Sequence, residues 1–368
     1  MSGVTGIIAE FNPFHNGHKL LLDAAGSDRT KVIVMSGNWM QRGEPAFVDK
    51  WTRTETALAS GADLVVELPL MSALQGADFF GQGAVNILKR LGVDEILFGS
   101  ESELDYQKIS GIYAEKADEM AAFMDELPEL MSYPLKAEKA WAHFANVQFD
   151  GNTPNHILGL AYAKAAAGTG IQLRTVQRQT NYNSTELGLG GEIASATAIR
   201  ENFSQAENFV PKNTWPLLEK APKTSWNDFW ELLRYKITVS QDLMDIYQVN
   251  EELSNRIKTY IKTSSNLSEL IEQVYTKRYT KGHIRRLLAY ILLDIPREFS
   301  LPEPIHVLGF SSKGQSILAQ ARENETPVVT RIGQFPWDAL TQRADEVYRL
   351  GNPGIPEQAY SRKPIIWN

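Results

Sequence analysis

Two histidines near the N-terminus, His15 and His18, have a spacing that would let them bind one phosphate group together. They follow an apolar run, Ile7-Ile8-Ala9, and an Asn12-Pro13 pair, which together predict a buried strand, a turn and a helix that runs to about residue 25. Histidines three residues apart share one face of a helical turn, and Gly17 between them lets the backbone come close to a ligand. The N–H groups at a helix start also attract anions. The segment therefore predicts a nucleoside triphosphate site without a P-loop lysine; the alternative is a pair of loop histidines that cap the helix or bind a metal.

The segments that follow predict the sheet that would position this site. Strands are expected over 31–35, 63–68, 95–98 and 171–178, and helices over 50–60, 83–91, 102–146 and 157–167. Alternation of this kind is typical of an α/β fold with a Rossmann-like, doubly wound parallel sheet. Loops at the carboxyl ends of such strands form one crevice, where ligands bind. The loop 36–45 contains two glycines and is long enough to reach over a ligand there.

A second segment, 194–200, could also bind an anion. It places Ser195 and Thr197 at a predicted helix start and Arg200 one turn later. Hydroxyl groups, backbone N–H groups and a guanidinium can all donate to one anion. Alone, the segment is more typical of ordinary helix capping, but beside the histidine pair in one α/β unit it indicates a shared phosphate site. Asn155 precedes another predicted helix, where it either caps that helix or contacts the ligand.

The composition limits the classes of function. The chain has 368 residues, a net charge of −7, 43% hydrophobic residues and no cysteine. This length predicts about two domains. The acidic balance argues against nucleic-acid binding over the whole surface but allows a local basic patch. A disulfide scaffold, a thiolate nucleophile and a cysteine-based zinc site are excluded. With no signal-peptide pattern and no apolar window of membrane-spanning length, we expect a soluble, cytoplasmic protein without a membrane partner.

The alternation of predicted strands and helices becomes irregular between residues 204 and 227, where three prolines occur, and we place a domain boundary there. One domain is expected over 1–205 and a mostly helical one over 206–368, with helices over 226–247 and 249–261. A small α/β tail follows, with strands over 306–310 and 327–330 and helices over 314–322 and 338–350. We expect this tail to pack beside the basic segment described next.

Residues 275–286 form a basic segment in a chain that is acidic overall. Its cations are Lys277, Arg278, Lys281, Arg285 and Arg286, and no acidic residue occurs between residues 273 and 293. Positive charge beside tyrosine suits an RNA backbone and base stacking. The alternative is an ordinary solvated helix start, with Leu287, Leu288, Tyr290 and Ile291 as its buried face.

The two phosphate motifs resemble the HxGH nucleotidyltransferase superfamily of adenylyl transferases. Further blocks resemble one of its members, the bacterial tRNA(Met) cytidine acetate ligase family. These blocks are Asn12-Pro13-Phe14-His15-Asn16-Gly17-His18, Met35-Ser36-Gly37-Asn38, Gln41-Arg42-Gly43-Glu44-Pro45, Phe98-Gly99-Ser100-Glu101, Pro154-Asn155, Ile193-Ala194-Ser195-Ala196-Thr197-Ala198-Ile199-Arg200 and Leu308-Gly309-Phe310. The resemblance covers nearly the whole chain.

The resemblance implies an ATP-dependent ligase. It would activate acetate as acetyl-adenylate and then acetylate N4 of the wobble cytidine, position 34, of elongator tRNA(Met). His15 and His18 would stabilise the α-phosphate or the leaving β-phosphate, and Arg178 and Arg200 would hold the distal phosphates. The other ATP-site residues would be Ile8, Ala9, Glu10, Phe11, Asn12, Pro13, Phe14, Asn16, Gly17, Leu21, Gly99, Asn155, Ser195 and Thr197. Mg²⁺ is expected with ATP, and Glu10 or Asp63 are the candidate carboxylates.

The chain departs from the family pattern at two places. His156 stands where the family has asparagine, and Tyr182-Asn183-Ser184 stands where it has Tyr-His-Asp, so we assign no catalytic role to positions 156, 183 and 184. Two other functions stay open. One is a small-molecule adenylyltransferase of nucleotide or coenzyme synthesis, which would leave the basic helical part without a role. The other is a non-catalytic RNA-binding protein, against which both intact phosphate motifs argue.

Overall fold

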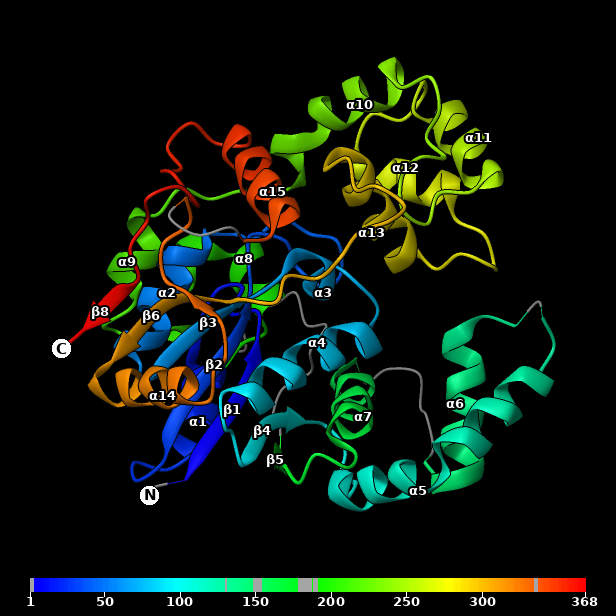
Figure 1. Ribbon diagram of the computed structural model, residues 1–368. Coiled ribbons are helices and arrows are strands. Elements are labelled where there is room, and N and C mark those ends of the chain that lie inside the picture. The colour runs from blue at the N-terminus through cyan, green and yellow to red at the C-terminus, as the bar shows by residue number, and fades with distance from the viewer. Residues whose placement is uncertain (1–2, 130, 148–153, 178–186, 188–190, 334–336) are drawn as a thin grey trace.

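The structure is a computed structural model that describes residues 3–129, 131–147, 154–177, 187, 191–333 and 337–368. Its described part contains one sheet in the order β5-β4-β1-β2-β3-β6-β7, with β8 beside β6 (Figure 1). The strands are β1 (Val4–Ala9), β2 (Thr30–Ser36), β3 (Leu64–Leu68), β4 (Glu95–Ser100), β5 (Gln172–Gln177), β6 (Ile305–Ser311), β7 (Val328–Val329) and β8 (Ile365–Trp367).

The first five strands are parallel. The chain passes from β1 through β2 to β3 and then returns to β4, on the other side of β1. The carboxyl ends of β1 and β4 therefore flank a topological switch point, the place where open α/β sheets bind ligands. The predicted doubly wound sheet is confirmed, and it puts the segment that carries His15 at this point.

Side chains of successive residues point to opposite faces of the sheet. Ile7, Ile33 and Val65 pack with helices α1 (Asn16–Ala24) and α2 (Lys50–Ala59) on one face. Ile8 and Val66 pack on the other face. The helices on that face are α4 (Ala77–Arg90), α5 (Tyr106–Glu126), α7 (Pro154–Ala166) and α14 (Ser312–Glu323), and α6 (Tyr133–Ala145) packs on α5. Both faces of the inner strands β1, β2 and β3 are thus buried, which is why these strands are mostly apolar. Strand β5, at the edge of the sheet, is mostly polar and partly exposed.

The helical part of the chain packs around a second core, which also contains Trp39 and Leu70 from the first half of the chain. Helices α10 (Trp230–Val239), α11 (Glu251–Tyr260), α12 (Leu267–Val274) and α13 (Lys281–Leu292) bury residues such as Leu253, Leu270 and Leu287 against one another. They gather to one side of the sheet, at the upper right of Figure 1. The remaining helices are α3 (Leu70–Ala73), α8 (Ala196–Glu201), α9 (Trp215–Lys220) and α15 (Ala339–Leu350), with short 3-10 turns at Phe203–Gln205, Glu207–Phe209 and Trp226–Phe229.

Several predicted element boundaries were wrong. Helix α4 begins at Ala77 rather than at residue 83. Gly81 and Gly83 do not interrupt this helix; they let it pack closely on neighbouring segments, since a Cβ on Gly83 would lie 2.6 Å from the Ser72 side chain. The helix expected over 226–247 ends at Val239. Helix α12 and strand β8 were not predicted.

The α/β tail is present, but its strands do not pack beside the basic segment. Strand β6 pairs antiparallel with β3, and β7 and β8 pair with β6, so all three extend the sheet of the first half of the chain. Only α15 meets the expectation, because Ala344 and Tyr348 share a core with α13. The division of the chain at residue 205 stays a prediction. No helix in the described ranges combines the length and the apolar character needed to cross a bilayer.

Candidate active site

The histidine pair lies at the carboxyl end of β1. His15 is the N-cap of α1, where its Nδ1 accepts a hydrogen bond from the Gly17 N–H at 3.0 Å. The His15 and His18 rings are stacked with their centroids 3.7 Å apart, and His18 also packs edge-on against Phe11 at 4.9 Å. Since Nδ1 of His15 accepts, the neutral ring carries its proton on Nε2, which can donate to an anion. The capping alternative is therefore correct for His15, and it leaves the phosphate role possible.

Gly17 is required by this arrangement. A Cβ at position 17 would lie 2.9 Å from Cε1 of His15, so any other residue would push the ring away from the helix start. The metal alternative finds no support: the residues described contain no group of three or more histidine, aspartate, glutamate or cysteine side chains suited to a metal ion.

The second motif meets the first at Asn12. Ser195 is the N-cap of α8, with Oγ accepting from the Ala198 N–H at 3.0 Å. Arg200, one turn later, donates from Nη1 to the Asn12 carbonyl at 2.7 Å and from Nη2 to Thr197 Oγ1 at 3.3 Å. The capping alternative for Ser195 is thus correct, and the structure also brings the Arg200 guanidinium to the loop that precedes the histidines.

The two asparagines of the first motif hold neighbouring segments. Asn12, whose peptide bond to Pro13 is cis, accepts a hydrogen bond at Oδ1 from the Phe47 N–H at 2.7 Å. Asn16 Nδ2 donates to the carbonyls of Glu192 and Asn208, at 2.8 and 2.9 Å. The Asn16 amide thus ties the motif to the segments before and after α8, and the Asn12 amide ties it to the loop that precedes α2.

The carboxyl end of β4 is held by a buried polar cluster that the sequence did not reveal. Tyr106 Oη lies 3.0 Å from Ser100 Oγ and 3.1 Å from His156 Nδ1. Burial is the main cause that raises the pKa of Tyr106. His156, which we left without a role, therefore links the start of α7 to the residue after Gly99. Asn155 lies in the first turn of α7, which begins at Pro154, rather than ahead of the helix as predicted.

Other predicted site residues divide by position. Phe11 and Phe14 are buried against His18. Ile8, Asn12 and Pro13 are also buried, and Ala9, Glu10 and Leu21 are half-buried. Glu10 follows β1, whereas Asp63 precedes β3 and accepts from Lys31 N–H and Ser311 Oγ at 3.0 and 2.8 Å. Asp63 thus lies at the amino end of its strand, away from the histidines, and is wrong as a magnesium candidate. Arg178, Asn183 and Ser184 lie outside the described residues.

The basic segment is split by the fold. Lys277, Arg278 and Lys281 are exposed, whereas Arg285 and Arg286 are half-buried and face the loop that contains Gly43. Acidic side chains accompany the exposed cations, since Lys281 pairs with Glu272 at 2.5 Å. The predicted buried face of α13, Leu287 to Ile291, is confirmed. RNA contact by the five cations stays a prediction.

Arg53 was missed because an arginine inside a helix pattern suggests an exposed side chain. Its guanidinium is fully buried and donates to the carbonyls of Glu10 at 2.7 Å, Ser36 at 2.9 Å and Gly37. Burial lowers its pKa, but an arginine stays charged at any ordinary pH. Arg53 therefore fixes the carboxyl ends of β1 and β2 relative to each other.

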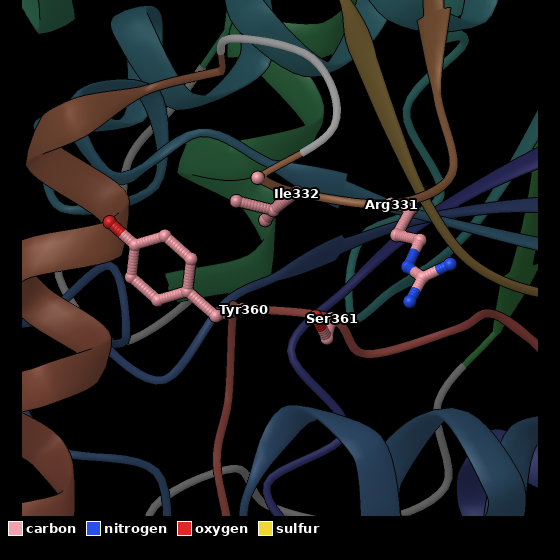
Figure 2. A pocket seen from close by; sticks show the side chains of 5 residues that line it. Arg331, Ile332, Tyr360 and Ser361 are labelled. Atoms are coloured by element: carbon pink, nitrogen blue, oxygen red, sulfur yellow. The ribbon is translucent and has the colours of Figure 1, made fainter.

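One cavity of about 450 Å³ lies elsewhere, lined by Arg331, Ile332, Gly333, Tyr360 and Ser361. It contains none of the predicted site residues. In Figure 2 the Tyr360 ring and the Arg331 guanidinium point away from each other, so the polar groups do not converge on a ligand.

Comparisons with known proteins identify the family of the chain. The family model HIGH Nucleotidyl Transferase matches residues 2–363. The tRNA(Met) cytidine acetate ligase of Lactococcus lactis subsp. cremoris (strain MG1363) is 53% identical over 100% of this chain and 99% of its own length. That of Streptococcus pneumoniae (strain JJA) is 54% identical over 98% of both chains.

Two solved structures are similar over 99% of both chains at 28% identity. They are Thermotoga maritima TmcAL without ligand, with a TM-score of 0.85, and the same protein bound with alpha-thio ATP, with a TM-score of 0.84. The chain therefore belongs to the tRNA(Met) cytidine acetate ligase family, within the HIGH nucleotidyl transferases.

Proposed function

We propose that this protein is an ATP-dependent ligase that acetylates N4 of the wobble cytidine, position 34, of elongator tRNA(Met) through acetyl-adenylate. The observation that carries the proposal is the meeting of both phosphate motifs at Asn12, beside the switch point of the sheet. The names of the relatives supply tRNA(Met), cytidine and acetate, and the alpha-thio ATP bound to TmcAL supports ATP as the activating nucleotide. A tRNA substrate would place the enzyme in the cytoplasm.

The first step needs charge stabilisation more than covalent help from the protein. An acetate oxygen attacks the α-phosphorus in line, the bond to the bridging oxygen breaks, and pyrophosphate leaves. His15 and His18 would donate to oxygens that gain charge, and Arg200, with Arg178, would hold the distal phosphates. In the second step the cytidine N4 attacks the acetyl carbonyl, AMP leaves, and N4 loses a proton.

Magnesium is a further part of the proposal. Glu10 is the candidate carboxylate, because it follows β1 at the same end of the sheet as the histidines. Its Oε1 accepts a hydrogen bond from the Gln41 N–H at 2.6 Å. Burial is the main cause that raises its pKa. When bound, the ion would neutralise phosphate charge. Magnesium that also contacts substrate phosphates usually needs only one or two carboxylates from the protein.

The exposed cations of the basic segment are proposed to bind the tRNA backbone. Replacing Lys277, Arg278 and Lys281 together by glutamate should weaken tRNA binding at least tenfold and reduce the slope of log affinity against log salt. Acetate-dependent ATP–pyrophosphate exchange, which needs no tRNA, should not change. Filter binding at several salt concentrations checks the first expectation. Unchanged tRNA affinity would remove this segment from the RNA site.

The whole function is tested by one reaction. Incubation of the protein with unmodified elongator tRNA(Met), ATP and acetate should yield one N4-acetylcytidine per tRNA, measured by mass analysis of the nucleosides. Omission of either ATP or acetate should abolish the product. Consumption of ATP without tRNA acetylation, with a small molecule adenylylated instead, would contradict the proposal.

A further inference from the structure

Two guanidiniums with different proposed partners share one carboxylate. Glu44 Oε2 lies 3.6 Å from Nη2 of Arg200, and Glu44 Oε1 lies 3.0 Å from Nη1 of Arg285. The three side chains stay 33%, 23% and 31% exposed, in the order Glu44, Arg200, Arg285, so incoming anions can reach them. A single residue therefore connects the arginine proposed to hold distal phosphates with an arginine of the basic segment.

The loop that carries Glu44 is held firmly between the two sites. Gly43 has φ +81° and touches α13 directly, because a Cβ there would lie 2.7 Å from backbone atoms of Arg285 and Arg286. Trp226 Nε1 donates to the Gly43 carbonyl at 2.8 Å. At the other end, Gln41 N–H donates to Glu10, which follows β1. The Glu44 carboxylate can thus move from one guanidinium to the other by side-chain rotation, without movement of the loop.

We propose that Glu44 is a positioning residue that makes triphosphate binding at Arg200 and RNA binding at Arg285 antagonistic. This rests on the proposed function. When distal phosphates occupy Arg200, the displaced carboxylate pairs fully with Arg285 and opposes an RNA phosphate there. When pyrophosphate leaves, Glu44 returns to Arg200 and Arg285 becomes available to RNA. Adenylation therefore precedes full engagement of the tRNA, and linkage requires RNA to weaken triphosphate binding by the same factor.

The test measures the Kd of the elongator tRNA(Met) transcript with and without saturating α,β-methylene ATP, in the absence of acetate. The analogue should raise the wild-type Kd about three- to fivefold, the range of partly exposed ion pairs. AMP, which lacks the distal phosphates, should leave that Kd unchanged. In Glu44→Gln the analogue should have no effect. Glu44→Asp, with a carboxylate one methylene shorter, should also lose most of the effect.

Glu272→Gln is the matched control. It removes a carboxylate that pairs with Lys281 in the same basic segment, and it should keep the wild-type antagonism. Equal antagonism in wild type and Glu44→Gln would assign the effect to repulsion between phosphates and overturn the proposal. So would an equal effect of AMP, or independent binding of both ligands to the wild type. Failure of the wild type to bind either ligand would contradict the proposed function, and the role of Glu44 with it.

Discussion

Replacement of His18 by alanine is expected to lower acetate-dependent ATP–pyrophosphate exchange by about 10²- to 10³-fold, the usual cost of removing one donor that stabilises transition-state charge. His18 lies in the first turn of α1, and its ring stacks on His15. Its loss removes a donor and the support for the second imidazole. The fall should appear mainly in kcat, because the additional negative charge on the phosphate oxygens develops only in the transition state.

A matched control separates this chemistry from packing. His143 on α6 also stacks on an aromatic ring, that of Phe123, with centroids 4.8 Å apart. His143→Ala removes the same atoms from a helix away from the sheet edge, and it should leave exchange at the wild-type rate. Near wild-type exchange in His18→Ala, with both variants folded by circular dichroism, would remove the histidine pair from the mechanism.

The parts of the site that could be predicted are those encoded within a few residues. His15 to His18 and Ser195 to Arg200 each form a strand-to-helix or loop-to-helix junction, where residue type and spacing decide what the backbone can offer. The ligand crevice at the carboxyl ends of the strands also followed from sequence, since alternating strands and helices favour a parallel sheet. The strand order that places the switch point between β1 and β4 did not. The pattern could not show which side chain caps a helix and which one can bind phosphate, because both roles require the same residue types.

Contacts between distant segments left no local pattern. Glu44 and Arg285 are 241 positions apart, and neither residue stands out beside other charged residues of a loop or a helix. The same holds for His156, whose partner Tyr106 was predicted only as part of a helix. Strands β6 and β7 of the tail were recognised, but their place in the sheet was not, because nothing in β6 itself specifies pairing with β3.

A buried ionic cluster around Lys50 was not predicted from the sequence. The Lys50 ammonium is fully buried, 2.8 Å from Glu67 and 2.5 Å from Asp345, and His306 Nδ1 lies 2.7 Å from Glu67. Burial raises the pKa of Asp345 to about 7. Burial alone would lower the pKa of Lys50, but both carboxylates raise it. The cluster joins α2, β3, α15 and β6, so it ties the tail to the sheet that carries the site.

Lys50→Met is therefore expected to destabilise the protein by about 3–5 kcal/mol, since it leaves two buried carboxylates without their cation. The loss should be larger at pH 8.5 than at pH 5.5. A carboxyl whose folded pKa is raised contributes stability that is lost as the pH rises through that pKa, and without Lys50 both carboxyls would favour the protonated form. Urea denaturation at the two pH values measures this. Lys116→Met, which breaks an exposed pair with Glu119, should cost less than about 0.5 kcal/mol at either pH. A Lys50→Met variant as stable as Lys116→Met, or one whose loss of folding stability is independent of pH, would show that the tail is held to the sheet by apolar packing rather than by this cluster.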